Sequence, residues 1–197
     1  MLSLKKGLLV VLSGPSGVGK GTVRSEVLKY FNSWYSVSVT SREKREGEIE
    51  GKDYFFVTRE EFEQKIRDNE FLEYNIYNGN YYGTLKSKID EKLEKNIDVF
   101  VEIEVNGAKN IKNVYEDSIL IYILPPSMEE LEERLRNRDT EDEEAIRNRM
   151  NIAKEELKEL NIYDYVVIND KVEDTVLKIK NIIESEKYRV SRNNTWF

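Results

Sequence analysis

A run of residues near the N-terminus has the composition of a phosphate-binding loop. The run is Gly14, Pro15, Ser16, Gly17, Val18, Gly19, Lys20, Gly21 and Thr22. In such a loop the glycines let successive backbone N–H groups turn onto phosphate oxygens, and Lys20 adds a mobile cation. An apolar run over residues 8–12 precedes the loop and an amphipathic run follows it, so strand, loop and helix come in the required order. The segment predicts binding of a nucleoside triphosphate, and the alternative is a glycine-rich turn without a ligand.

The position after Lys20 departs from the common phosphate-loop pattern. That pattern places a hydroxyl there for Mg²⁺, whereas this chain has Gly21 followed by Thr22. We therefore expect Mg²⁺ to be held mainly by nucleotide phosphates and water. Thr22 is the nearest candidate from the loop.

The composition excludes several kinds of catalysis. The chain has no His and no Cys, so nucleophilic catalysis with a His partner, imidazole proton transfer and the usual zinc sites are all excluded. Carboxylates, Lys, Arg, hydroxyls and backbone amides remain. Phosphoryl transfer needs little more, because it depends on positioning and charge stabilisation rather than on a protein nucleophile.

The net charge of −7 over 197 residues argues against a broad basic surface for nucleic acid. The apolar run before the loop is too short for a secretion signal or a membrane span, and it leads directly into the loop. The expectation is a cytoplasmic enzyme with small anionic ligands, no nucleic acid and no membrane partner. The sequence does not predict an oligomeric state.

Apolar runs alternate with helical patterns along most of the chain. The expected strands cover residues 8–13, 36–40, 99–104, 119–124 and 165–169. This alternation predicts an α/β fold with a parallel sheet flanked by helices, of the P-loop NTPase type. Helix starts are indicated at Thr58, Ser127 and Asp170, each followed by Glu three positions later. After Thr140 the apolar spacing predicts a long helix with one buried stripe.

Two segments interrupt this pattern. Residues 41–84 are polar and rich in Gly and Tyr, with short strand-like runs around one helix at about 59–68, which indicates a small α+β insertion. Residues 134–149 contain five arginines among many acids, and a helical lid is expected at about 136–147. The remaining core would comprise residues 1–40 and 85–187 of a single domain, followed by a tail at 188–197.

Several motifs together resemble the guanylate kinases. They are SVSVTSREKREGE at 36–48, GKDYFF at 51–56, FLEY at 71–74, GNYYGT at 79–84, EIEVNG at 102–107, RLRNRDT at 134–140 and VIND at 167–170. The resemblance covers about residues 7–187 in unbroken order. It implies a reversible, Mg²⁺-dependent transfer from ATP to GMP that gives ADP and GDP. This family also accepts Gly followed by Thr after the loop lysine.

The resemblance implies an acceptor site for GMP. Its residues would be Ser38, Arg42, Arg45, Tyr54, Glu73, Tyr82, Thr84, Glu102 and Glu104. Chemistry supports several of these, because forked guanidinium groups grip a phosphate bidentately and a carboxylate complements the N1–H and N2–H donors of guanine. Glu102 is a second candidate for ordering Mg²⁺ water. Glu104 and Asn106 stand where the family usually has Asp and Gln.

The resemblance also implies the donor site and the catalytic cations. ATP would bind at residues 14–22 with Arg138 and Asn169, and Lys20, Arg42, Arg138 and Arg149 would stabilise the transferred phosphoryl group. Other interpretations of single residues stay open at this stage. An arginine can simply solvate a face, tyrosines can pack as cross-strand aromatics, Glu102 and Glu104 can be strand-end charges, and Asn169 can be a turn former.

Two other functions are alternatives to a GMP kinase. Guanylate-kinase-like domains also occur as non-catalytic scaffolds that bind phosphorylated partners in the acceptor groove. The intact glycines and Lys20 of the loop argue against a scaffold here. A monophosphate kinase with another base preference fits the loop but leaves the motif at 38–54 unexplained.

Overall fold

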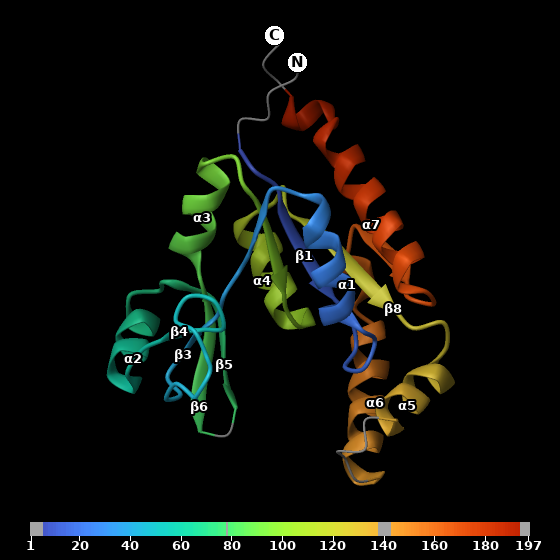
Figure 1. Ribbon diagram of the computed structural model, residues 1–197, viewed down its shortest axis with the longest axis horizontal. Coiled ribbons are helices and arrows are strands. Elements are labelled where there is room, and N and C mark those ends of the chain that lie inside the picture. Colours follow the sequence, from blue (N-terminus) through green and yellow to red (C-terminus); the bar gives the residue numbers. More distant parts are fainter. Residues whose placement is uncertain (1–5, 78, 138–142, 194–197) are drawn as a thin grey trace.

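The protein is built on a five-stranded parallel sheet (Figure 1). The computed structural model describes residues 6–77, 79–137 and 143–193. The parallel strands are β1 (Leu9–Ser13), β2 (Ser33–Tyr35), β7 (Asp98–Glu102), β8 (Ile119–Leu124) and β9 (Tyr165–Ile168). They run in the order β2-β7-β1-β8-β9, and all four neighbouring pairs are parallel. The predicted α/β fold with a parallel sheet is confirmed.

Helices cover both faces of this sheet, and the central strand shows why. In β1, Val10 and Leu12 pack into one apolar cluster, whereas Leu9 and Val11 pack into another. The alternation is the period of two that places successive side chains on opposite faces. The first cluster is shared with α1 (Lys20–Val27) and α7 (Val172–Lys187), and the second with α3 (Lys86–Glu94) and α4 (Val105–Val114). A buried β1 therefore fixes the loop that follows it.

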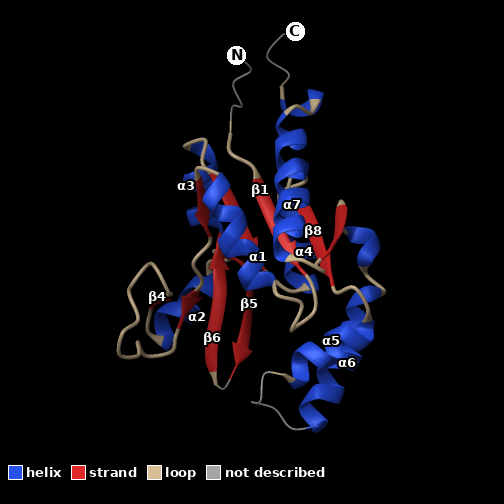
Figure 2. Cartoon of the chain, turned by 45° about the vertical axis from the view of Figure 1, so that its right-hand side comes forward, coloured by secondary structure: helices blue, strands red, loops and turns tan. Residues whose placement is uncertain are grey.

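A second sheet forms the insertion. It contains β3 (Val39–Thr40), β4 (Phe55–Phe56), β5 (Phe71–Tyr77) and β6 (Asn80–Leu85) in the order β4-β3-β6-β5. Figure 2 shows β5 and β6 as a long hairpin. Helix α2 (Arg59–Arg67) packs on this sheet through Phe62, which stacks on Phe71 and Tyr81 with ring centroids 4.3 and 5.0 Å apart. Tyr81 on β6 thus packs beneath α2, and across the hairpin its ring centroid lies 6.4 Å from that of Tyr74 on β5.

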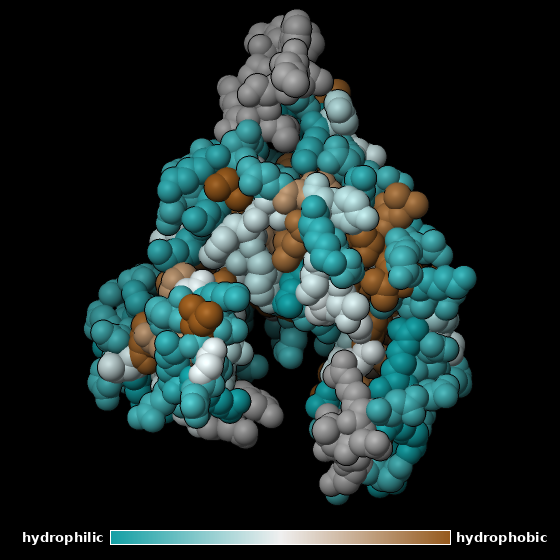
Figure 3. Space-filling view, viewed as in Figure 1, coloured by the Kyte–Doolittle hydropathy of each residue, from teal (hydrophilic) through white to brown (hydrophobic). Residues whose placement is uncertain are grey.

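Two helices lie on the opposite side of the molecule from the insertion. They are α5 (Met128–Arg136) and α6 (Glu143–Leu157), and an ion pair between Arg136 and Glu143 joins them. The molecule is hollowed between this helix pair and the insertion, and the surface around the hollow is mostly hydrophilic (Figure 3). Residues 138–142 of the expected lid lie outside the described residues.

Short 3₁₀ helices complete the description. They are η1 (Leu28–Tyr30), η2 (Leu160–Ile162) and η3 (Val190–Arg192). Within the described ranges no helix is long and apolar enough to cross a membrane.

Two local expectations were wrong. The strand expected at residues 36–40 is misplaced: the parallel sheet takes Ser33–Tyr35 instead, and within the expected range only Val39 and Thr40 form a strand, paired with β4 and β6 in the insertion. An alternating pattern fits either sheet, so the sequence does not distinguish them. The helix start expected at Asp170 is also displaced, because α7 begins after Lys171 without a side-chain cap. The starts at Thr58 and Ser127 are confirmed by hydrogen bonds from the backbone N–H groups of Glu61 and Glu130.

Candidate active site

The phosphate loop connects β1 to α1 at the carboxyl edge of the sheet. Gly14 and Gly19 have φ angles of +150° and +94°, a region in which only glycine is unstrained. A Cβ atom on Gly14 would also lie 2.4 Å from the carbonyl oxygen of Ile123 on β8. These two glycines let the chain turn tightly against the sheet. The turn places the N-terminus of α1 at the sheet edge where open α/β sheets bind their ligands.

Two cations lie on this loop. Nζ of Lys20 donates hydrogen bonds to the carbonyl oxygens of Gly14 and Pro15, at 2.6 and 3.1 Å. Arg149 on α6 donates to Oγ of Ser16 at 2.5 Å. Helix α6 therefore reaches the loop through Arg149, one of the arginines that the resemblance implies for phosphate.

The buried side chain of Asn169 stabilises the phosphate loop through a hydrogen bond to its backbone. Asn169 is 3% exposed, and its Nδ2 donates to the carbonyl oxygen of Val18 at 2.7 Å. Oγ1 of Thr175 on α7 donates to Oδ1 of Asn169 at 3.0 Å. The two ends of the amide thus join the loop to α7, a contact that the expected role of Asn169 at the ATP site did not anticipate.

A cavity of about 590 Å³ lies between the insertion and the edge of the parallel sheet. Its walls come from β5 and β6 on one side and from the end of β7 and the start of α4 on the other. The expected acceptor residues among its lining are Ser38, Glu73, Tyr82, Glu102 and Glu104. Residues far apart in the sequence therefore meet in one polar cavity, as the acceptor hypothesis requires.

Glu73 is a half-buried carboxylate of this cavity. Burial raises the pKa of Glu73, the hydrogen bond from Thr84 opposes this, and the nearby carboxylate of Glu104 adds to it. Oγ1 of Thr84 donates to Oε1 of Glu73 at 2.9 Å. A Cβ atom on Gly107 would lie 2.2 Å from the Ile103 side chain and 3.3 Å from Cγ of Glu73, so glycine keeps α4 close to this carboxylate. A buried anion that is only partly compensated suits a ligand with two adjacent N–H donors.

Arg42 lies beside the two expected tyrosines. Its guanidinium carbon is 5.5 Å from the centroid of the Tyr54 ring, and the rings of Tyr54 and Tyr82 are 5.7 Å apart in an edge arrangement. The Glu48 carboxylate pairs with Arg42 at 2.5 Å. Hydrogen bonding to Glu48 is the main reason that the pKa of Arg42 is raised. Arg45 is exposed on the same loop.

Arg24 is a functional candidate that the sequence did not predict. Arg24 on α1 donates to Oε2 of Glu102 at 3.0 Å, and its guanidinium carbon lies 4.2 Å from the centroid of the Tyr35 ring. Arg24 follows Lys20 by one helical turn, so this contact connects the helix of the phosphate loop to the acceptor cavity. The signal in the sequence was the i, i+4 spacing of Lys20 and Arg24, but the partner of Arg24 is 78 residues away.

The structure does not bring all the expected residues together. Arg138 lies outside the described residues. Thr22 is exposed in the first turn of α1, and Glu102 is engaged by Arg24. Arg134 and Arg136 pair with Glu130 and Glu132 of their own helix.

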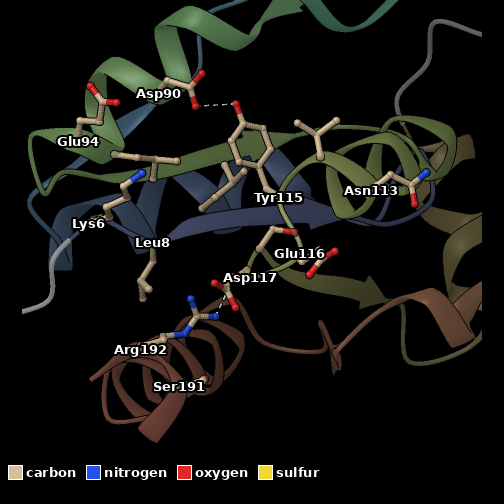
Figure 4. Close-up of a pocket in the computed structure, with 15 residues that line it drawn as sticks. Lys6, Leu8, Asp90, Glu94, Asn113, Tyr115, Glu116, Asp117, Ser191 and Arg192 are labelled. Atoms are coloured by element: carbon tan, nitrogen blue, oxygen red, sulfur yellow. Dashed lines mark hydrogen bonds between the residues drawn. The ribbon is translucent and has the colours of Figure 1, made fainter. Parts of the chain in front are cut away.

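A second cavity, of about 650 Å³, opens at the amino edge of the parallel sheet. Figure 4 shows Asp90 beside the hydroxyl of Tyr115, which donates to it at 2.9 Å, and Arg192 beside Asp117, whose carbonyl oxygen accepts at 2.7 Å. Parallel α/β sheets bind their ligands at the opposite edge. This cavity is therefore separate from the phosphate loop and the acceptor cavity.

The fold and the loop define a P-loop kinase: a parallel sheet flanked by helices, a lysine-bearing phosphate loop after the first strand, and a polar acceptor cavity across a cleft. A family model described as guanylate kinase matches residues 6–186. The chain accordingly belongs to the guanylate kinase family.

Individual relatives agree with this family. The chain is 54% identical to the guanylate kinase of Clostridium tetani, covering 96% of this chain and 91% of that protein. It is 50% identical to the guanylate kinase of Lactococcus lactis, covering 95% and 92%. Among solved structures, the guanylate kinase of Anaplasma phagocytophilum matches with a TM-score of 0.74 and 35% identity, covering 95% of this chain and 90% of that one.

Proposed function

We propose that this chain catalyses the reversible transfer of a phosphoryl group from ATP to GMP, which gives ADP and GDP. The observation that supports this most is the position of two sites at one edge of the parallel sheet. The phosphate loop with Lys20 follows β1, and the cavity that contains Glu73 opens beside it at the end of the neighbouring strand β7. Membership of the guanylate kinase family supports the same reaction. The scaffold and another base preference have no observation in their favour.

On the donor side, residues 14–22 would bind the phosphates of ATP through backbone N–H groups and the N-terminus of α1. Lys20 would leave its two loop carbonyls and follow the transferred phosphoryl group. Arg149, already on Ser16, and Arg138 would neutralise the charge that develops in the transition state. Asn169 would contact adenine, and its bond to Val18 would also fix the loop.

On the acceptor side, Arg42 and Arg45 would grip the phosphate of GMP, with hydroxyl hydrogen bonds from Tyr54 and Tyr82. Glu73 would accept from N1–H and N2–H of guanine, while Ser38 and Thr84 would contact the O6 edge. Glu104 would contact the base or its waters, and Glu102 would face the phosphates. Adenine presents an acceptor at N1, so it would be rejected.

Magnesium would enter with ATP. No group of three or more Asp or Glu side chains that could hold a metal ion occurs in the part of the chain that the structure describes, which fits a cation held by phosphates and water. When bound, Mg²⁺ supplies neutralising charge to the phosphate oxygens. Thr22 is the hydroxyl nearest to that position in the loop, and Glu102 is the carboxylate that would order its water.

We also propose an arrangement in parts. The core would be residues 1–40 and 85–187, the GMP-binding insertion residues 41–84, the lid about 136–147, and the tail residues 188–197. The second sheet begins at Val39 and ends at Leu85, one or two residues beyond the proposed insertion on each side. We propose a cytoplasmic location, because the substrates of this reaction are cytoplasmic nucleotides.

A coupled assay of ADP release tests the reaction and its acceptor. The purified chain is incubated with ATP and Mg²⁺, and GMP, AMP, UMP and dGMP are offered in turn. We expect rapid release with GMP, weaker release with dGMP and very little with AMP or UMP. Activity with AMP or UMP above that with GMP would favour another monophosphate kinase, and no activity with any acceptor would favour the scaffold.

A further inference from the structure

The loop between β3 and β4, residues 41–54, contains a carboxylate, Glu48, that contacts the side chain of Arg42 and the backbone of Arg45. Its Oε1 accepts from Nη2 of Arg42 at 2.5 Å. Its Oε2 accepts from the backbone N–H of Arg45 at 2.7 Å. The two side chains of the ion pair are only 12% and 19% exposed, so this contact is more protected than an ordinary surface salt bridge.

We infer that Glu48 is a positioning residue for the acceptor phosphate, because it fixes the direction of the Arg42 guanidinium and the backbone of Arg45 together. The inference rests on the proposed function, which assigns the phosphate of GMP to these two arginines. Glu48 itself would not touch the phosphate. Its role would be to hold the fork in the shape that the phosphate needs.

The surroundings of Arg42 support this role. Its Nη1 donates to the carbonyl oxygen of Glu43 at 2.7 Å, and its guanidinium carbon lies 5.5 and 5.8 Å from the centroids of the Tyr54 and Phe56 rings. The guanidinium is thus held at one edge by Glu43, at another by Glu48, and near aromatic rings. An arginine held in this way loses less conformational freedom when it binds a ligand.

Charge decides whether Glu48 helps or competes. Glu48 balances the charge of one guanidinium of the pair, and the second guanidinium can still attract a dianionic phosphate. Both oxygens of Glu48 are already used, one on a guanidinium and one on a backbone N–H. Glu48 can therefore stay in place while the remaining donors of Arg42 bind phosphate.

The same loop offers a matched control. Oε2 of Glu50 accepts from the backbone N–H of Phe56 at 3.2 Å. Removing that carboxylate loosens the loop without touching the Arg42 ion pair. Comparing Glu48→Ala with Glu50→Ala therefore separates the positioning of Arg42 from general stiffness of the loop.

The experiment measures by calorimetry how tightly GMP, guanosine and ATP bind to the full chain. Wild type is compared with three variants, Glu48→Ala, Glu48→Gln and Glu50→Ala. Glu48→Ala should weaken GMP binding about tenfold, the scale of ordering one long side chain in the complex. Guanosine, which lacks the phosphate, and ATP should bind as they do to wild type. Glu48→Gln should fall between Glu48→Ala and wild type, and Glu50→Ala should keep the wild-type ratio of guanosine to GMP affinity.

The outcomes separate this inference from the proposed function. If wild type does not bind GMP more tightly than guanosine and does not phosphorylate it, the proposed function is wrong. If wild type does both but GMP binds Glu48→Ala as tightly as wild type, or more tightly, Glu48 does not position the fork. Equal losses for GMP and guanosine would assign Glu48 to the loop fold alone. A thermal melt identifies unfolded Glu48→Ala, in which case Glu48→Gln decides by the same ratio.

Discussion

The replacement of Glu73 by Gln isolates base recognition from general activity. Gln keeps the size of the side chain and leaves one acceptor oxygen, which Thr84 already contacts in the wild type. The amide then turns an N–H donor toward the N–H donors of guanine. Leaving a buried charged hydrogen bond unpaired costs about 2–4 kcal/mol. We therefore expect kcat/KM for GMP to fall about 30- to 1000-fold.

The assay measures kcat/KM with GMP and with IMP, which has N1–H but lacks the 2-amino group. The loss with IMP should be smaller, and the KM for ATP should barely change. Glu70→Gln is the matched control, because Glu70 lies just before β5 and pairs with Lys65 at 2.9 Å. Equal losses toward GMP and IMP, or a collapse of ATP binding, would make Glu73 a structural residue and would move base recognition to Glu104.

The pH dependence gives a second readout of the same substitution. Because burial raises the pKa of Glu73, its ionised form is lost at a higher pH than that of an ordinary Glu. The wild-type kcat/KM for GMP should therefore decline on the acid side, and Glu73→Gln should lack that limb. A raised pKa also means that Glu73 contributes stability at acid pH and loses it as pH rises through its folded pKa. At neutral pH the Gln variant should melt at or above the wild-type temperature.

Three further substitutions or measurements test other parts of the site. Lys20→Ala should lower kcat about 100- to 1000-fold with an unchanged melting temperature, measured by the coupled assay; near-normal turnover would remove Lys20 from catalysis. Arg42→Lys should raise the KM for GMP although the charge is kept, because the bidentate geometry is lost. Wild type should bind guanosine more weakly than GMP in calorimetry, and equal binding of the two would contradict the phosphate assignment. Amide exchange over residues 41–84 and 143–147 should slow when both nucleotides bind, and unchanged exchange at saturation excludes closure.

The fold was predictable where one local pattern has one meaning. The buried run that becomes β1, the loop glycines and the amphipathic α1 all point to the same structure. The insertion helix expected at about 59–68 is α2 (Arg59–Arg67) because Thr58 forms a complete capping box with Glu61. The assignment of Val39 and Thr40 to the insertion was not predictable, because Val39 alternates with its neighbours in a way that suits either sheet. Long-range hydrogen bonding decides such a case, and a single sequence does not contain it.

The sequence predicted which residues belong to the site, but it did not predict the contacts that they make with one another. Glu73, Tyr82 and Glu104 were expected at the acceptor site and line one cavity. The ion pairs of Arg24 with Glu102 and of Arg42 with Glu48 were missed. The first joins residues 78 positions apart, and the second lies within a motif whose acids resemble solvated charges. Both depend on how the loops fold back, which no spacing rule fixes.

Direct transfer between the two nucleotides is the central claim, and one measurement tests it most closely. The chain is incubated with ATP labelled at the γ-phosphorus, GMP and Mg²⁺, and the products are separated. We predict that the label appears in the β-phosphate of GDP at the rate at which ADP forms. Label released as inorganic phosphate, with GMP unchanged, would contradict the account and leave the chain an ATPase whose acceptor cavity serves another purpose.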